Sequence, residues 1–266
     1  MKYSVLCSDL DGTLLSSKDD VSDFTISEIS KIKDKIDIVL VSARMPKSIT
    51  YLQKRLQIED QPIICYNGAL ILNGSQEISS TTIAVNHLAN IHRMCDELGI
   101  KLGLYHKDDW YVEEISERVG KEIKYTHAMP VFENTSETLK RWEDSGIGAH
   151  KIMLMATKSS ADSIMPRLLE KFNAYLHLYR SNNTLIEITP KPVSKLSAIQ
   201  TLLKNKSLAD VVAFGDNYND IDMLQYAGCG VAVGNARDEV KAIADHTTLK
   251  NTQDGVAYFI QQHILI

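Results

Sequence analysis

Two aspartates, two positions apart, follow a short apolar segment near the start of the chain. Asp9 and Asp11 come shortly after residues 3–7, which have the composition of a buried strand. Because residues i and i+2 of an extended chain point to the same side, the two carboxylates would repel each other and push one pKa upward. A divalent cation such as Mg²⁺ is the usual way to neutralise two hard oxygen ligands. The segment therefore predicts metal-assisted chemistry on an anion.

Three further segments place polar groups where strands of a parallel sheet would end or helices begin. Ser42 and Ala43 follow the β-branched run 36–41, the acidic segment 215–220 follows another apolar run, and Lys195 opens a helical pattern. Ligands of open α/β sheets bind beyond the carboxyl ends of the strands, so these groups are expected to meet at one rim. The rim would combine carboxylates, a hydroxyl, backbone N–H donors and one lysine.

This set of groups is suited to phosphoryl transfer. Carboxylates can hold a metal ion, and the metal, a lysine and backbone N–H groups can cover the negative oxygens of a phosphoryl group. The loop after Ser42 leads into a helix, whose first N–H groups are donors for an anion. A carboxylate can also accept the phosphoryl group covalently, as an aspartyl-phosphate.

The hydrophobic pattern predicts how these groups are positioned. Strand and helix patterns alternate over the first part of the chain, which is typical of a mostly parallel sheet. Between residues 84 and 188, strands that meet in hairpins alternate with helices, which indicates an inserted α+β module. We therefore expect a Rossmann-like α/β domain formed by residues 1–83 and 189–266, interrupted by an α+β domain of residues 84–188.

Two segments of the chain are expected to be connections between these elements. The polar segment 133–148 has the composition of a surface loop, and the two prolines of segment 189–192 are typical of a stiff linker back to the first domain. By contrast, Asn73-Gly74 lies between β-prone residues and predicts a hairpin turn.

Composition excludes several classes of protein. The 266 residues are 44% hydrophobic and 24% charged, as in ordinary globular proteins. The formal net charge of -5 argues against general nucleic-acid binding, and no apolar run has the length of a transmembrane helix. The N-terminus lacks the apolar core of a signal peptide, and the cysteines are scattered without a C-x-x-C pair. We therefore expect a cytoplasmic protein with reduced thiols and with neither nucleic-acid nor membrane partners.

The motifs resemble those of the haloacid dehalogenase (HAD) superfamily of phosphatases. Residues 9–14 match its first motif, Ser42 its hydroxyl motif, Lys195 its lysine motif and residues 215–220 its acidic motif. The large insert between the second and third motifs resembles the cap domain of the Cof-type subfamily. Two further segments are similar to that subfamily, Asn67-Gly68-Ala69 and Asp254-Gly255-Val256.

The resemblance implies Mg²⁺-dependent hydrolysis of small phosphomonoesters through an aspartyl-phosphate. Sugar phosphates and phosphorylated cofactors such as pyridoxal phosphate are the implied substrate classes. The inserted domain would be a cap that closes over the core, excludes bulk water and selects the leaving group.

The resemblance also implies a role for individual residues. Asp9 would be the nucleophile on phosphorus, and Asp11 would protonate the leaving alcohol and then deprotonate the hydrolytic water. Asp9, the main-chain carbonyl of Asp11 and Asp216 would bind Mg²⁺. Asp220 would support the metal site or orient Lys195. The implied phosphate-binding residues are Leu10, Ser42, Ala43, Lys195 and Asn219.

Two other functions are compatible with the same residues. A phosphomutase of hexose phosphates uses the same aspartyl-phosphate but returns the group to a sugar instead of water. A non-catalytic phospho-ligand-binding protein would bind without turnover, although the intact Asp9, Asp11, Lys195 and Asp216 weigh against it. In each case the expected partner is a small phosphorylated metabolite, and the protein is expected to be a monomer or a homodimer.

Overall fold

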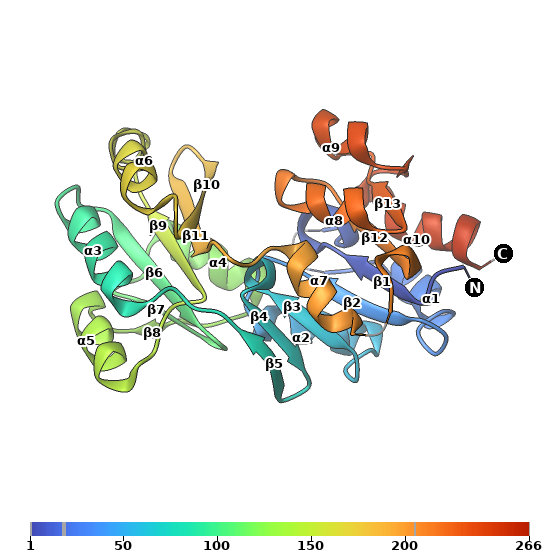
Figure 1. Cartoon of the computed structure of the whole chain (residues 1–266), viewed down its shortest axis with the longest axis horizontal. Helices are drawn as coiled ribbons and strands as arrows, with labels where there is room; N and C mark the ends of the chain where they lie inside the picture. The colour runs from blue at the N-terminus through green and yellow to red at the C-terminus, as the bar shows by residue number, and fades with distance from the viewer. Residues whose placement is uncertain (1, 18–19, 205, 266) are drawn as a thin grey trace. The chain divides into compact units, whose positions relative to one another are not determined.

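The chain divides into two compact units. A computed structural model describes residues 2–17, 20–204 and 206–265. The first unit combines the residues up to Ile78 with those from Ser194 onward, and the second unit is Ser79–Val193 (Figure 1). The expected insert, residues 84–188, falls inside the second unit.

The first unit is built on a mostly parallel sheet. The first motif, residues 9–14, directly follows the central strand of this sheet. The strand order is β14-β13-β12-β1-β2-β3-β4-β5, in which β1 pairs in parallel with both β2 and β12. β4 is antiparallel to β3 and leads to β5, so the hairpin expected at Asn73-Gly74 is present. The strands are β1 (Val5–Ser8), β2 (Asp37–Val41), β3 (Pro62–Cys65), β4 (Leu70–Asn73), β5 (Gln76–Ser80), β12 (Val211–Gly215), β13 (Cys229–Ala232) and β14 (His246–Thr247).

Helices cover both faces of this sheet. Successive strands run outward from β1 in two directions, and right-handed crossovers then place the two sets of helices on opposite faces. One set contains α1 (Asp23–Ser30), α2 (Pro46–Leu56) and α10 (Gly255–Phe259), which contact one another through α1. The other set contains α7 (Lys195–Leu203), α8 (Ile221–Tyr226) and α9 (Asp238–Ile243), which contact one another through α8.

The second unit is an antiparallel sheet with helices packed on one face. Its strand order is β10-β11-β9-β6-β7-β8, and only the short edge pair β7–β8 is parallel among the pairings described. Helices α3 (Val85–Asp96), α5 (Thr135–Ser145) and α6 (Lys158–Phe172) cover this face (Figure 1). Their apolar side chains are buried in one cluster with those of the strands. The other elements are α4 (Glu117–Thr126), β6 (Lys101–His106), β7 (Asp109–Val112), β8 (Val131–Phe132), β9 (Lys151–Met155), β10 (Leu176–Asn182) and β11 (Leu185–Pro190).

These two sheets confirm the predicted α/β core with an α+β insert, but two expected connections are regular structure. The segment 133–148 contains helix α5, because the Asn134 side chain accepts hydrogen bonds from the first N–H groups and Leu139 and Trp142 are buried one turn apart. Thr189 and Pro190 of the expected linker are the last residues of β11, paired with β10.

Two properties of the described residues bear on the class of protein. None of the cysteines forms a disulfide bond, and all of them are buried. None of the described helices combines the length and the apolar character that crossing a membrane requires.

Candidate active site

The predicted site residues gather at the carboxyl edge of the parallel sheet of the first unit. Asp9 follows β1, Ser42 follows β2 and Asp216 follows β12. Lys195 is the first residue of α7, whose start is fixed by a reciprocal pair of hydrogen bonds between Ser194 and Ser197. The sheet register therefore brings residues from distant parts of the sequence to one edge.

A wide turn after Asp9 gives this edge its shape. The N–H groups of Leu14 and Leu15 donate to the carbonyl oxygens of Asp9 and Leu10, at 3.3 and 3.0 Å. Gly12 has φ +86°, and a Cβ atom there would lie 2.6 Å from Oδ2 of Asp216. The turn therefore needs glycine both for its backbone conformation and for its closeness to Asp216.

Lys195 is enclosed between two carboxylates. Its Nζ lies 2.5 Å from Oδ1 of Asp9 and 2.6 Å from Oδ1 of Asp220, and its side chain is only 1% exposed. Burial lowers the pKa of Lys195, but Asp220 and Asp9 outweigh burial and raise it above its ordinary value. The ammonium group is therefore a permanent positive charge in the floor of the site.

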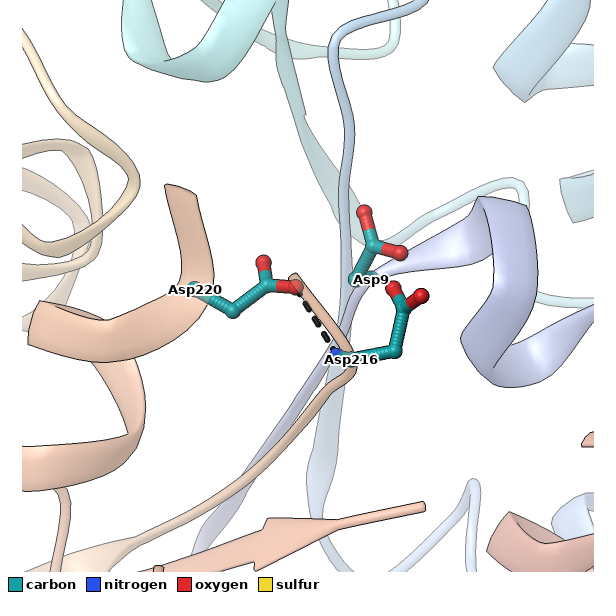
Figure 2. A group of neighbouring side chains, drawn as sticks. All are labelled: Asp9, Asp216 and Asp220. Carbon is teal, nitrogen blue, oxygen red and sulfur yellow. Dashed lines mark hydrogen bonds between the residues drawn. The ribbon is translucent and has the colours of Figure 1, made fainter. Parts of the chain in front are cut away.

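Asp9, Asp216 and Asp220 form a compact group of carboxylates. One oxygen of each lies within 4.8 Å of the others (Figure 2). Oδ2 of Asp220 accepts hydrogen bonds from the N–H groups of Asp216 and Asn217, both at 3.0 Å, while its Oδ1 accepts from Lys195. Thr13 donates to Oδ1 of Asp216 at 3.2 Å. Figure 2 shows Asp9 and Asp216 side by side, with Asp220 bonded back to the chain at Asp216.

The pKa values of this group report an excess of negative charge. Burial raises the pKa of Asp9, Lys195 lowers it, and Asp220 and Asp216 raise it further, to about 8. Burial and then Asp220 raise the pKa of Asp216 to about 6. Three carboxylates therefore share a single lysine, and their full ionisation requires more positive charge.

The donor set fits Mg²⁺. Carboxylate oxygens are the ligands that this cation prefers, and a divalent charge would offset the two negative charges that Lys195 leaves unbalanced. Among the described residues, Oδ2 of Asp9 and Oδ2 of Asp216 accept no hydrogen bond, whereas both oxygens of Asp220 do. Asp9 and Asp216 are therefore better placed to be ligands than Asp220.

The predicted phosphate-binding residues lie on the same rim. Ser42 is buried, and its Oγ accepts the N–H of Arg44 at 3.1 Å, whereas helix α2 begins only after Met45. Ser42 is therefore not the helix cap. Ala43 follows it in the loop, and Leu10 is buried in the turn after Asp9.

Asn219, the fifth predicted phosphate-binding residue, is exposed in a short turn before α8. Its Nδ2 donates to Oδ1 of Asn67 at 3.1 Å. The turn that contains Asn67 packs against the start of α7, since a Cβ at Gly68 would lie 2.4 Å from the carbonyl oxygen of Ser194. The segment Asn67-Gly68-Ala69 thus joins two parts of the rim.

The carboxylate of Asp11 does not crowd that of Asp9, contrary to the expectation from the sequence. The chain leaves the extended conformation at the turn, and the Asp11 side chain does not belong to the carboxylate group. Instead both of its oxygens accept hydrogen bonds from Arg44, at 2.7 and 2.6 Å. The crowding inferred from the i, i+2 spacing is therefore avoided, because Arg44 holds Asp11 while Asp9 lies against Lys195.

Three side chains of the rim were assigned no role from the sequence. Arg44 is one, although its place two residues after Ser42 is a signal. Nδ2 of Asn235 donates to the carbonyl oxygen of Gly12 at 2.8 Å, and Nδ2 of Asn251 donates to that of Leu15 at 2.9 Å. The N–H of Asn251 also donates to Oδ1 of Asn235 at 2.8 Å. The two amides therefore clamp the turn after Asp9, and no local pattern indicates that role.

Comparison with known proteins finds relatives along nearly the whole length of the chain. The family model described as haloacid dehalogenase-like hydrolase matches residues 6–260. A Haemophilus influenzae protein provisionally named a phosphatase is 31% identical over 271 residues, which cover 98% of each chain. The pyridoxal phosphate phosphatase of Escherichia coli is 26% identical over 276 residues, and the match covers 100% of both chains.

Solved structures give the same result. The haloacid dehalogenase-like hydrolase from Bacteroides thetaiotaomicron has a TM-score of 0.90 and 27% sequence identity, and the match covers 98% of this chain and 99% of that one. The assignment from the motifs to the Cof-type phosphatases is confirmed at the level of the family. The chain belongs to the haloacid dehalogenase-like hydrolases.

Proposed function

We propose that this protein hydrolyses small phosphomonoesters with the help of Mg²⁺ and through an aspartyl-phosphate on Asp9. The observation that carries the proposal is the placement of Asp9, which is buried beside Lys195 and within 4.8 Å of Asp216. A carboxylate fixed by a lysine is an oriented nucleophile, and the charge of Lys195 lowers the pKa that burial raises. The same lysine supplies positive charge where a phosphoryl group would arrive.

In the first half of the reaction, an oxygen of Asp9 attacks phosphorus and the bond from phosphorus to the ester oxygen breaks. Asp11 gives a proton to that oxygen, which leaves as an alcohol. The hydroxyl of Ser42 and the N–H groups of Leu10 and Ala43 bind the phosphoryl oxygens, together with Lys195. Asn219 adds an amide donor from its exposed turn.

In the second half, a water oxygen attacks phosphorus and the bond from phosphorus to Asp9 breaks. Asp11, now a carboxylate, removes a proton from that water, so inorganic phosphate leaves and both aspartates return to their starting forms. Lys195 stays between Asp9 and Asp220 throughout. Asp220 therefore orients the lysine and does not touch the substrate.

Asp9, the main-chain carbonyl of Asp11 and Asp216 would hold Mg²⁺. When bound, the ion neutralises these carboxylates and withdraws charge from the phosphoryl oxygens. Asp220 and Thr13 would keep Asp216 in place through the hydrogen bonds already described.

The substrate classes that we propose are sugar phosphates and phosphorylated cofactors. The pyridoxal phosphate phosphatase of Escherichia coli supports the second class, since this chain covers its full length. Residues 79–193 contain none of the residues assigned to the reaction, and we assign to this unit the choice between leaving groups.

Phosphate release from a panel of phosphorylated metabolites tests the proposal. The panel includes pyridoxal 5′-phosphate and hexose phosphates, is assayed with and without Mg²⁺, and reports kcat/KM for each compound. We expect Mg²⁺-dependent release that Asp9→Asn abolishes, while the exposed Asp34→Asn variant retains it.

The products separate the proposed reaction from its rivals. An isomerised hexose phosphate without free phosphate would identify a mutase. Binding across the panel without any turnover would identify a phospho-ligand-binding protein. A wild-type rate in Asp9→Asn would contradict the aspartyl-phosphate.

A further inference from the structure

Arg44 and Asp11 form a two-pronged ion pair at the edge of the site. Nε of Arg44 donates to Oδ2 of Asp11 at 2.7 Å, and Nη2 donates to Oδ1 at 2.6 Å. The two parallel bonds fix the carboxylate plane as well as its position, which a single point charge would not do.

The arginine is the anchored member of this pair. Its side chain is 7% exposed, whereas that of Asp11 is 54% exposed, although arginine is the longer residue. The backbone of Arg44 is held at both ends, because its N–H donates to Oγ of Ser42 and its carbonyl oxygen accepts the N–H of Tyr66 at 3.2 Å. The guanidinium group is therefore a fixed support, and Asp11 is the group that it holds.

The two cations of the site give the two aspartates different surroundings. Lys195 holds Asp9 in the buried group with Asp216, whereas Arg44 holds Asp11 outside that group. Without Arg44, the exposed carboxylate of Asp11 would be free to turn toward a bound cation, since carboxylates are the preferred ligands of such a cation. Arg44 thus keeps the two neighbouring aspartates apart.

We propose that Arg44 is the positioning residue for Asp11, whose carboxyl group it holds outside the carboxylate group and toward the departing ester oxygen. Each oxygen of Asp11 has a second lone pair, so the paired group can still carry or accept a proton. The inference rests on the proposed function, in which Asp11 is the acid and base. It makes no use of Arg44 as a ligand of the phosphoryl group.

The leaving group of the substrate separates these two roles of an arginine. An ester with a strongly basic leaving group depends on proton donation, whereas 4-nitrophenolate leaves readily without it. If Arg44 acts through Asp11, its loss should slow phenyl phosphate much more than 4-nitrophenyl phosphate. If Arg44 bound the phosphoryl group, which both esters share, its loss should slow them equally.

The experiment compares kcat/KM for phenyl phosphate and 4-nitrophenyl phosphate in wild type, Arg44→Met, Arg44→Lys and Asp11→Asn. We expect Arg44→Met to lower the value for phenyl phosphate by about 100-fold, within the range for loss of general acid catalysis, and that for 4-nitrophenyl phosphate by less than about 10-fold. Arg44→Lys should restore part of the difference, because it returns the charge without the fork. In the Asp11→Asn background, Arg44→Met should have no further effect on the ratio.

Arg55→Met is the matched control, because Arg55 lies on α2, the helix that follows Arg44, is 41% exposed and pairs with Asp20 away from the site. It should leave both values unchanged. The ratio of the two kcat/KM values does not depend on the folded fraction, so a less stable variant still gives an answer. Equal losses on both esters, or no loss on either, would overturn the inference. Absence of turnover by the wild type on both esters would instead contradict the proposed function.

Discussion

The ammonium group of Lys195 lies 2.5 Å from Oδ1 of Asp9, although 186 residues separate the two in the sequence. Lys195→Met would leave Asp9 and Asp220 buried without their cation. We expect activity to fall by about 1,000-fold, since a fixed charge next to the reacting atoms is lost. We also expect the metal-free protein to lose about 3–5 kcal/mol of unfolding free energy, as when one member of a buried ion pair is removed.

Chemical denaturation in the absence of Mg²⁺ measures the loss of unfolding free energy, and steady-state kinetics measure the loss of activity. Lys191→Met is a suitable control, because Lys191 is exposed and lies only a few residues earlier in the chain. A stable but inactive Lys195→Met protein would show that the lysine acts on the substrate alone and does not hold the carboxylates.

Stability of the metal-free protein should fall as the pH rises. The folded pKa values of Asp9 and Asp216, about 8 and about 6, lie above those of the unfolded chain, so folding favours the protonated forms. This stabilisation is complete below about pH 4, the unfolded value, and is lost as the pH rises through the two folded values.

Mg²⁺ should reverse that loss, because a divalent cation favours ionised carboxylates and binds the folded state only. We expect the rise in melting temperature on adding Mg²⁺ to be larger at pH 8 than at pH 5, and to shrink in Asp216→Asn. Thermal melts over this pH range, with EDTA or with Mg²⁺, measure it. An equal rise at both pH values would contradict the assignment of these carboxylates to the cation.

Gly12→Ala should impair the site more than the fold. A Cβ at this position would lie 2.6 Å from Oδ2 of Asp216, so the carboxylate would have to move, and φ +86° would add backbone strain. Gly74→Ala is the matched control, because its φ of +57° brings similar strain but nothing lies within 4 Å of the added atom.

We expect both variants to lose about 1 kcal/mol of unfolding free energy, and Gly12→Ala alone to require a higher Mg²⁺ concentration for half-maximal activity. Titration of activity with Mg²⁺ measures this difference. Similar Mg²⁺ dependence in the two variants would mean that Asp216 is displaced without consequence.

His150 should make the second unit sensitive to acid. Burial, with smaller contributions from His106 and Lys107, lowers the pKa of His150 to about 3. Its Nδ1 accepts the N–H of Lys107 at 3.2 Å, so Nε2 carries the proton and donates to Ser80 at 3.0 Å. A second proton would therefore break the first of these bonds.

Since the folded pKa of His150 lies below the unfolded value of about 6.5, its contribution is present above that pH and is lost as the pH falls toward about 3. We expect His150→Asn, which does not titrate, to flatten the fall in unfolding free energy between pH 6.5 and pH 4. His92→Gln, a half-buried histidine of the same unit, should leave the slope unchanged. Denaturation at several pH values measures how the unfolding free energy of each variant depends on pH. An unchanged slope in His150→Asn would contradict the assignment of this acid sensitivity to His150.

Much of the site could be predicted because parallel strands end at one edge. The motifs after β1, β2 and β12 are local, and the sheet register alone brings Asp9, Ser42 and Asp216 together. The pairing of Asp11 could not be predicted in this way, because a turn redirects its side chain and the reach of Arg44 depends on tertiary structure.

Dependence on tertiary structure also explains why the prediction of a surface loop at residues 133–148 was wrong. Within α5 only Leu139 and Trp142 are large apolar residues, and the cap residue Asn134 is equally typical of a turn. The sheet on which the helix packs supplies most of the reason for it to form, and a short window of sequence does not contain that information.

The central place of β1 determines when the site can exist during synthesis. β1 emerges from the ribosome before its neighbour β12, which begins only at Val211, and the amides that clamp the turn after β1 follow at Asn235 and Asn251. Until those residues have emerged, β1 has an open edge and no complete site. A nascent chain arrested before β12 should therefore be inactive and prone to aggregation, and activity should begin only after Asn251 has emerged.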